Sequence, residues 1–348
     1  MHIKNSAVGS LKRKTSLEPK AKTDWMSCLR ERYDKQELSE DAIKLVMASW
    51  RDSTKSEYST YISKWIIFCN SRDYDPLSAP INQIADFLRN MYWEGRSYST
   101  INLARSALSA LGIKYEGLSV GSHPTIVRLL KGIFNLRPTR ARYTETWDAN
   151  IVLNYLKTIP MDNELYLKDL TMKLTMLLAL TLAARPQTLH QLSTNNMIKT
   201  ENKIILNLSA ALKHTRPGKP LEKIEVNAYP HDKSLCVYTT LNEYLSCTEQ
   251  WRGKDGPLLI SYVKPHKSVS RDTVKRWIKM IMDNAGIDTS KFKAYSTRSA
   301  STSKAVAVST PIDWILKTAG WSRQSTFAKF YNKNIVTEQS FSENILTL

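Results

Sequence analysis

The chain contains little cysteine, in none of the arrangements in which cysteine usually works. Its 348 residues include only Cys28, Cys69, Cys236 and Cys247, which lie far apart and form no C-x-x-C pair. Structural zinc sites need cysteines at short spacing, and small secreted domains need a dense set of them for disulfides. The sequence therefore argues against both and predicts free thiols in a reducing compartment.

Long hydrophobic runs are also missing. The longest apolar stretch, Leu174 to Ala184, is interrupted by two threonines and is too short to span a bilayer, so it predicts a buried helix. We find no secretory signal in the polar N-terminal residues and expect no membrane partner. The Lys12-Arg13-Lys14 trio fits either part of a nuclear localisation signal or a solvated tail.

The short motifs that mark metal and nucleotide sites are absent as well. The sequence has no G-x-x-x-x-G-K-[ST], no H-E-x-x-H and no G-x-S-x-G. We therefore predict no metal and no cofactor, so that any chemistry has to rest on the side chains themselves.

What the chain has in excess is positive charge. Its 50 Lys and Arg residues against 32 Asp and Glu give a net charge of +18. A soluble protein this basic usually binds a polyanion, and nucleic acid is the first candidate. An acidic membrane surface is the second, and a basic, well-solvated protein without such a partner is the third.

Length and apolar periodicity predict two domains of mainly α structure. Residues 1–40 show little periodicity and predict a basic flexible arm with one short helix. Residues 41–136 predict a helical bundle, with helices that begin near Ser53, Ile81, Ser99 and Pro124. Residues 137–146 contain Pro138 and many arginines and predict a basic linker.

Residues 147–335 predict a second, mostly helical domain with a small antiparallel β-hairpin. Strands are expected at 203–208 and 221–226, with a turn-rich tip at 212–218 between them. Helices are expected at about 148–158, 168–184, 234–246, 270–284, 297–308 and 327–331. One more is expected to open with a capping box at 310–313, with Pro311 as its first helical residue, and to end at Gly320. The tail at 336–348 predicts a short helix.

Metal-free phosphoryl transfer needs a nucleophile, positive groups that hold the non-bridging oxygens, and an acid for the leaving oxygen. Arginine suits the second task because its guanidinium is always charged and binds phosphate through two hydrogen bonds. Arg185 precedes Pro186 and is therefore expected at a break between two helices. Arg298 is flanked by small residues, which let its helix approach a ligand closely.

Each of these residues also has a plainer interpretation. Arg185 could bind free carbonyls at a helix end, and Arg298 could be a surface arginine on a close-packed helix. Trp321 and Tyr331, taken singly, would be core aromatics.

Their order along the chain is more specific. Arg185, a hairpin lysine at Lys213, the box Tyr295-Ser-Thr-Arg298, the Gly320-Trp321 pair and then Tyr331 resemble the tyrosine recombinase (phage-integrase-like) family over about residues 45–335. In detail, Tyr-Ser-Thr-Arg-Ser-Ala-Ser-Thr-Ser-Lys-Ala and Gly-Trp-Ser-x-x-Ser-Thr-Phe-x-Lys-Phe-Tyr look like the recombinases of eukaryotic DIRS- and Ngaro-type retrotransposons. The N-terminal domain matches only in its helical pattern.

The resemblance implies an enzyme that cuts and rejoins DNA through a 3′-phosphotyrosyl intermediate, for integration of a mobile element. Arg185 and Arg298 would hold the scissile phosphate, and Lys213 would protonate the leaving 5′-oxygen. Trp321 would take the family's His/Trp position and hydrogen-bond the phosphate, and Tyr331 would attack it. The covalent bond conserves the phosphodiester energy, so neither metal nor ATP is needed.

The sequence departs from the family pattern at three positions. Tyr295 stands where the second box usually begins with His, and a phenol is a poor base near neutral pH. Thr188 stands where an acidic residue usually follows the first arginine. Tyr331 lies one residue later than in bacterial members, where Phe330 now stands, but the DIRS-like pattern has the same shift.

The resemblance also implies a two-domain clamp on double-stranded DNA, assembled as a tetramer on two DNA sites in the nucleus. The tail residues Phe341, Ile345 and Leu346 would pack on a neighbouring protomer. The cations expected to contact DNA, each with a solvated surface charge as its plainer interpretation, are Lys55, Arg96, Arg105, Arg137, Arg140, Arg142, Arg271, Lys275 and Arg276.

Two other functions stay open at this point. One is a DNA-binding protein descended from such a recombinase, with catalysis weakened by Tyr295. The other is a type IB topoisomerase-like enzyme, which shares the chemistry but nicks and closes one duplex without bringing two sites together.

Overall fold

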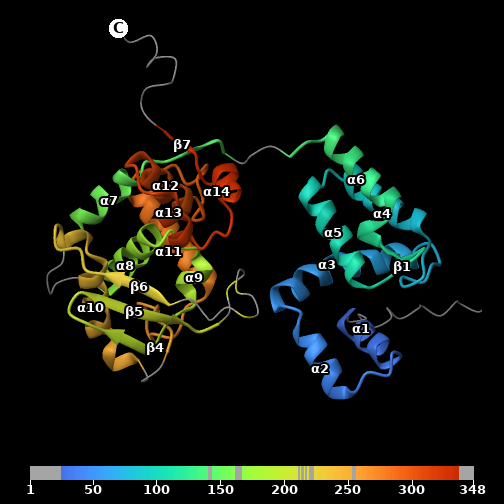
Figure 1. Ribbon diagram of the computed structural model, residues 1–348, viewed down its shortest axis with the longest axis horizontal. Coiled ribbons are helices and arrows are strands. Elements are labelled where there is room, and N and C mark those ends of the chain that lie inside the picture. Colours follow the sequence, from blue (N-terminus) through green and yellow to red (C-terminus); the bar gives the residue numbers. More distant parts are fainter. Residues whose placement is uncertain are drawn as a thin grey trace, which may run out of the picture. The chain divides into compact units, whose positions relative to one another are not determined.

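The computed structural model describes residues 25–139, 143–160, 167–210, 212, 215, 218, 223–252 and 256–336. The chain divides into two compact units, Met1–Ala141 and Arg142–Leu348, and each is treated by itself (Figure 1). The division falls within the stretch 137–146, of which residues 140–142 lie outside the described residues. Both units are mainly helical, which confirms the predicted fold class.

The described part of the N-terminal unit is a helical bundle. Its helices are α1 (Trp25–Asp34), α2 (Glu40–Ala48), α3 (Asp52–Asn70), α4 (Ile81–Trp93), α5 (Tyr98–Ala110) and α6 (Pro124–Leu136). A two-stranded hairpin, β1 (Lys114–Tyr115) with β2 (Leu118–Ser119), and a 3₁₀ turn η1 (Val120–Ser122) join α5 to α6. The helices α3 to α6 are the four that the apolar periodicity predicts. They pack around fully buried side chains such as Trp65, Leu88 and Leu108.

The arm predicted over residues 1–40 contains the one short helix that was expected, and this helix packs into the core of the N-terminal unit. Residues 25–34 form α1, and Trp25 and Leu29 are buried in the core of the N-terminal unit. The Trp25 indole Nε1 donates to Ser59 Oγ at 2.9 Å, and its ring lies edge-on to Trp50 with centroids 5.4 Å apart. Only two residues of this charged helix are buried, which is too few to produce a periodic pattern. Residues 1–24 lie outside the described residues.

The C-terminal unit is built around one long buried helix, α8 (Leu167–Thr181), in which every side chain from Leu170 to Leu180 is buried. Around it pack α10 (Val237–Thr248), α11 (Arg271–Asn284) and α12 (Ser296–Ala307). The remaining helices are α7 (Ala149–Thr158), α9 (Pro186–His190), α13 (Ile312–Ala319) and α14 (Gln324–Phe330), with 3₁₀ turns η2 (Lys233–Leu235) and η3 (Glu249–Trp251).

A three-stranded antiparallel sheet of order β4-β5-β6 forms one end of this unit, and α12 to α14 gather at the other (Figure 1). The strands are β4 (Leu192–Lys199), β5 (Lys203–Leu208) and β6 (Ile224–Asn227). Ile204 pairs with Val226 and Leu206 with Ile224, which fixes the predicted hairpin in register. Strand β4 was not predicted. Its second part, Asn195 to Lys199, is too polar to show the alternation of a half-buried strand.

The start of α13 differs from the prediction. Pro311 is the N-cap residue, with extended backbone angles, and no side chain caps the helix. The predicted capping box at 310–313, with proline as the first helical residue, is therefore wrong. Gly320 does end the helix, in the left-handed conformation with φ of 64°. The short tail helix predicted beyond residue 336 lies outside the described residues.

Two general properties bear on function. Among the residues that the structure describes, no helix is long and apolar enough to cross a membrane. The same residues hold no group of three or more His, Cys, Asp or Glu side chains placed to bind a metal ion.

Lys173 is an unusual member of the core. It is fully buried in the middle of α8, and its Nζ donates to the carbonyl of Ile159 at 2.7 Å. Burial lowers the pKa of this ammonium group, and the charge of Asp232 opposes that shift. The folded chain therefore carries a penalty for charging Lys173.

We expect Lys173→Met to raise the unfolding free energy at pH 7 by about 1 kcal/mol, since it removes a buried charge at the loss of one hydrogen bond. The folded pKa is below the unfolded value, so the wild type gains stability as pH rises toward about 10.4. The advantage of the variant should shrink over the same range. Urea denaturation at pH 7 and pH 9.5 measures both effects, with Lys168→Met on the exposed face of α8 as control. A Met variant that is less stable than the wild type at pH 7 would contradict this account.

Candidate functional site

Arg185 lies at the predicted break between two helices. After α8 ends at Thr181, Ala183 adopts a φ of 43°, and Arg185 is extended directly before Pro186 opens α9. Its side chain is half-buried and forms no hydrogen bond or ion pair with the described residues. The alternative that Arg185 binds free carbonyls at a helix end is not what the structure shows.

Arg298 is held in the opposite way. Its side chain is only 4% exposed, so the alternative of a surface arginine is wrong. Nη1 donates to the carbonyl of Ala183 at 2.8 Å, and Nη2 donates to the carbonyl of Ala319. One guanidinium thus joins α12 to the chain break after α8 and to the last residue of α13. A guanidinium has five N–H donors, and these two bonds leave three of them for a ligand or water.

Two aromatic side chains stack on this guanidinium. The Cζ atom of Arg298 lies 4.2 Å from the ring centroid of Trp321 and 5.3 Å from that of Tyr331. The two rings are themselves 4.4 Å apart, centroid to centroid. The structure therefore brings together three of the predicted catalytic residues, although they lie on α12, after α13 and after α14.

Two donors in this group have no acceptor. Arg298 Nε and the indole Nε1 of Trp321 are buried and lack a hydrogen-bond partner among the described residues. A buried donor without an acceptor costs about 1–3 kcal/mol, so such groups usually bind a ligand or an ordered water molecule. Both belong to the residues that the sequence assigns to phosphate binding.

The backbone of Tyr331 is fixed from two sides. Ser303 Oγ, on α12, donates to the carbonyl of Tyr331 at 3.2 Å and accepts from the amide of Lys333 at 3.0 Å. Just beyond, β7 (Asn334–Ile335) pairs in parallel with β3 (Glu145–Thr146). Ser303 lies in the Tyr-Ser-Thr-Arg-Ser-Ala-Ser-Thr-Ser-Lys-Ala stretch that carries the resemblance, but the sequence analysis assigned it no role.

A cleft of about 640 Å³ opens beside Arg298. Its floor includes Arg185, Thr188 and Arg298. One wall comes from β6 and the residue before it, and the other comes from α13. The polar and aromatic side chains on these walls are Lys223, Glu225, Asn227, Trp314, Lys317 and Thr318.

Arg185 acts on the charge of Arg298. Burial and, second to it, the nearby charge of Arg185 lower the pKa of Arg298 to about 9, against an opposing effect of Tyr331. The group remains protonated at neutral pH. Two positive charges that face one cleft without a carboxylate bound to either form a site for an anion.

The other predicted catalytic residues are placed less directly. Lys213 lies outside the described residues. Tyr295 is the residue before α12 and is 46% exposed; its one described ring contact is with Lys275, whose Nζ lies 5.6 Å from the ring centroid. Tyr295 lies outside the stack of Arg298, Trp321 and Tyr331, and its side chain does not line the cleft.

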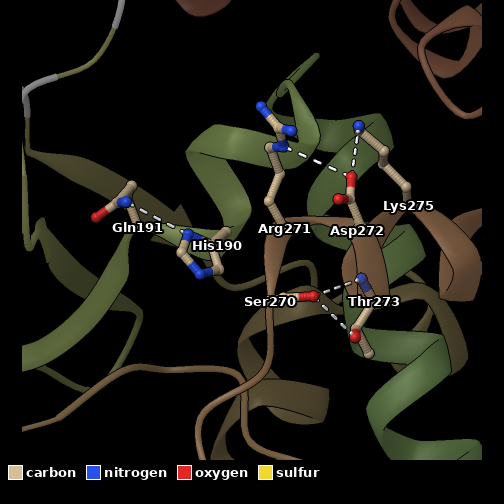
Figure 2. Close-up of polar contacts among 7 residues, drawn as sticks. All are labelled: His190, Gln191, Ser270, Arg271, Asp272, Thr273 and Lys275. Atoms are coloured by element: carbon tan, nitrogen blue, oxygen red, sulfur yellow. Dashed lines mark hydrogen bonds and ion pairs between the residues drawn. The ribbon is translucent and has the colours of Figure 1, made fainter. Parts of the chain in front are cut away.

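A basic group lies where α9 and α11 pack together (Figure 2). Arg271 Nε and Lys275 Nζ approach the same oxygen of Asp272, at 3.7 Å and 2.7 Å, and Ser270 caps the helix. Hydrogen bonding and the charge of Lys275 lower the pKa of Asp272, so this acid is ionised at neutral pH. Two cations against one carboxylate leave the N-terminus of α11 positive, and its contact with DNA stays a prediction.

The remaining cations predicted to bind DNA differ in whether protein hydrogen bonds hold their side chains. Arg105 Nη1 donates to the carbonyl of Gly121 at 3.1 Å, and Arg137 donates to the carbonyls of Tyr92 and Arg96 while its guanidinium covers the Tyr92 ring. These two arginines hold the N-terminal unit together. Surface side chains of the set, each with a weak polar partner, are Lys55, Arg96 and Arg276. Arg140 and Arg142 lie outside the described residues.

Comparison with known proteins places the fold. No protein-family model matches the chain, and no curated protein sequence matches it. Solved structures do match: a lambda integrase (75–356) dimer bound to a COC′ core site has a TM-score of 0.51 at 16% identity, over 90% of this chain and 97% of the integrase. The XerH site-specific recombinase bound to palindromic difH has 0.57 at 13% identity, over 88% and 91%. The Tn1549 transposon integrase with transposon right end DNA has 0.57 at 11% identity, over 91% and 96%. The chain therefore shares the fold of these tyrosine recombinases.

Because Arg298 is hydrogen-bonded in the core and Arg185 is not, replacing each one should change the free energy of unfolding by a different amount. Arg298→Met should lower the unfolding free energy by about 2 kcal/mol, because two buried carbonyls lose their donor. Arg185→Met should change it by less than about 0.5 kcal/mol, because the side chain contacts no partner. Urea denaturation of the two variants beside the wild type checks this, and equal losses would show that the geometry is wrong.

Proposed function

We propose that the protein is a site-specific DNA recombinase that cuts and rejoins strands through a covalent bond between Tyr331 and a DNA 3′-phosphate. The observation that carries the proposal is the stack of Arg298, Trp321 and Tyr331, which contains two buried donors without a partner among the described residues. Arg298 of this stack lines a cleft together with Arg185. The net charge of +18 and the shared fold with recombinases that bind DNA support it.

The reaction would proceed by two displacements at one phosphorus atom. The phenol of Tyr331 gives up its proton to water as its oxygen attacks phosphorus, and the bond from phosphorus to the 5′-oxygen breaks. The leaving 5′-oxygen takes a proton, which the family resemblance assigns to Lys213. A 5′-hydroxyl of another strand then attacks the phosphotyrosine and releases Tyr331, which recovers its proton.

The arginines act on the charge that develops on the non-bridging oxygens. Arg298 is already aligned by its two backbone carbonyls, so it loses little freedom when the phosphate binds. Arg185 has no hydrogen-bond or ion-pair partner among the described residues and can turn its guanidinium toward the phosphate. Removing one such donor typically raises the barrier by about 3 kcal/mol.

The finer parts of the proposal rest on the family resemblance. They are integration of a mobile element of the DIRS or Ngaro type, action in the nucleus, and a tetramer on two DNA sites. The catalytic role that the resemblance gives to Tyr295 stays a prediction, because this side chain lies outside the stack and does not line the cleft.

Covalent trapping tests the proposal. Duplexes that bind the protein are first enriched from random-sequence DNA, and a nick is then moved along the enriched duplex. When the nick lies near the cleaved phosphate, the short fragment diffuses away and religation is blocked. We expect the wild type to form a denaturation-resistant protein–DNA adduct and Tyr331→Phe to form none, because the phenol oxygen is the nucleophile.

The matched control is Tyr74→Phe, which changes an exposed tyrosine of the N-terminal unit and should trap like the wild type. Binding without any adduct would favour the DNA-binding protein without catalysis. An adduct together with relaxation of supercoiled DNA, but without strand exchange between two sites, would favour the topoisomerase-like enzyme.

The charge at the N-terminus of α11 gives a second test. Replacing both Arg271 and Lys275 with Gln should reduce the slope of log affinity against log salt by about 2, if each side chain neutralises one phosphate. Gel-shift titrations between 50 and 300 mM salt measure the slope. Replacing Lys168 and Lys279, two other surface lysines of the C-terminal unit, is the control for net charge. An equal change in both double variants would mean that α11 has no special role.

A further inference from the structure

Trp314, on α13, is a large aromatic side chain that is mostly exposed to solvent. It is 68% exposed, while its neighbour Ile315 and Ala319 from the same helix are buried against Trp321 and Phe327. The indole of Trp314 makes no ring contact with another described side chain, and it lines the cleft that holds Arg185 and Arg298. A large aromatic side chain at the edge of a charged cleft is available to whatever enters that cleft.

Lys317 is a second exposed residue of α13 that lines the cleft. Lys317 lies three residues after Trp314, which places both on one side of α13, and it lines the same cleft. Asp313 precedes it by one helical turn, yet no ion pair forms between them in the described structure, and Lys317 stays exposed. The cleft is also lined by Lys223, the residue before β6, and by Glu225 on β6, whose charges offset each other. The positive charge of the outer cleft therefore lies on α13.

The cleft is larger than one phosphate needs. Its volume of about 640 Å³ falls in the range of sites for whole small molecules. The inner end, with two arginines, suits the phosphate. The outer end offers a flat aromatic surface and a separate cation, a combination that suits a nucleobase and the next phosphate of a strand.

We propose that Trp314 stacks on the nucleobase adjoining the phosphate that Tyr331 attacks, and that Lys317 pairs with the next phosphate along that strand. This inference rests on the proposed function. It makes α13 a positioning element, which holds the nucleotide beside the scissile phosphate and so favours a strand whose base can turn out of the stack.

The test is a double-mutant cycle between protein and DNA. Affinities are measured with Tyr331→Phe protein, so that no cleavage takes place, on the enriched duplex and on a series in which one abasic nucleotide is moved through each position. We expect Trp314→Ala to weaken binding about tenfold on the intact duplex, the size usual for loss of one stacked base. On the duplex that lacks the contacted base, the same substitution should change affinity less than twofold.

The control is Trp93→Ala, which removes a tryptophan that is 75% exposed on the other unit, and it should show no such coupling. Lys317→Gln should lower the salt slope by about 1 on every duplex of the series, because its contact is with a phosphate. Melting temperatures of the variants verify that they fold, and Trp314→Phe should retain most of the binding.

The inference is overturned if Trp314→Ala acts equally on the intact duplex and on every abasic duplex, or has no effect on binding. It is also overturned if the substitution alters only self-association, since Trp314 would then contact a second copy of the chain. Coupling without any covalent adduct from the wild type would leave the stacking in place and reject the recombinase. An adduct without coupling would reject the stacking alone.

Discussion

The buried guanidinium of Arg298 is the contact on which the rest of the candidate site depends. It binds the carbonyl at the break after α8 and the carbonyl at the end of α13, two places that are 136 residues apart in the chain (183 and 319). It also supports the rings of Trp321 and Tyr331. A cation with that many fixed neighbours cannot move far, so its free donors point in a set direction. Catalysis of phosphoryl transfer relies on charge that is oriented in advance in this way.

Much of this could be predicted from the sequence, because the signals are local. Gly320 after an apolar helix indicates a helix end, and a residue before Pro186 is expected to leave the helical region. Both are found as expected. The strand at 203–208 was predicted at its observed bounds because its apolar residues form a short run rich in β-branched side chains. The order of Arg185, Arg298, Trp321 and Tyr331 pointed to a shared site before any geometry was available.

What could not be predicted depends on contacts between distant segments. The two carbonyls that bind Arg298 have no sequence signature, since every residue has a carbonyl. The burial of Trp25 depends on Trp50 and Ser59, and two buried residues in a charged helix leave no periodicity to read. Trp314 could have been found, because the pattern of Ile312, Ile315, Leu316 and Ala319 puts it on the outer side of its helix. The separation of Tyr295 from the stack was not visible in the motif that joins it to Arg298.

The positive charge of the chain serves two purposes, which the composition alone does not separate. Arg105 and Arg137 donate hydrogen bonds to backbone carbonyls and so connect segments of the N-terminal unit. Arg185 and Lys317 line the cleft, and their side chains have no polar partner among the described residues. Arg271 and Lys275 outnumber the one acid, Asp272, that they both approach. The cations of this second kind are the ones that a polyanion can reach.

The central claim is that the phenol oxygen of Tyr331 becomes bonded to DNA. Mapping the trapped adduct by mass spectrometry, after digestion of the protein with trypsin and of the DNA with nuclease, tests it most directly. The account predicts a nucleotide attached through its 3′-phosphate to Tyr331 and to no other residue. Attachment to Tyr295, to a serine or through a 5′-phosphate would contradict it.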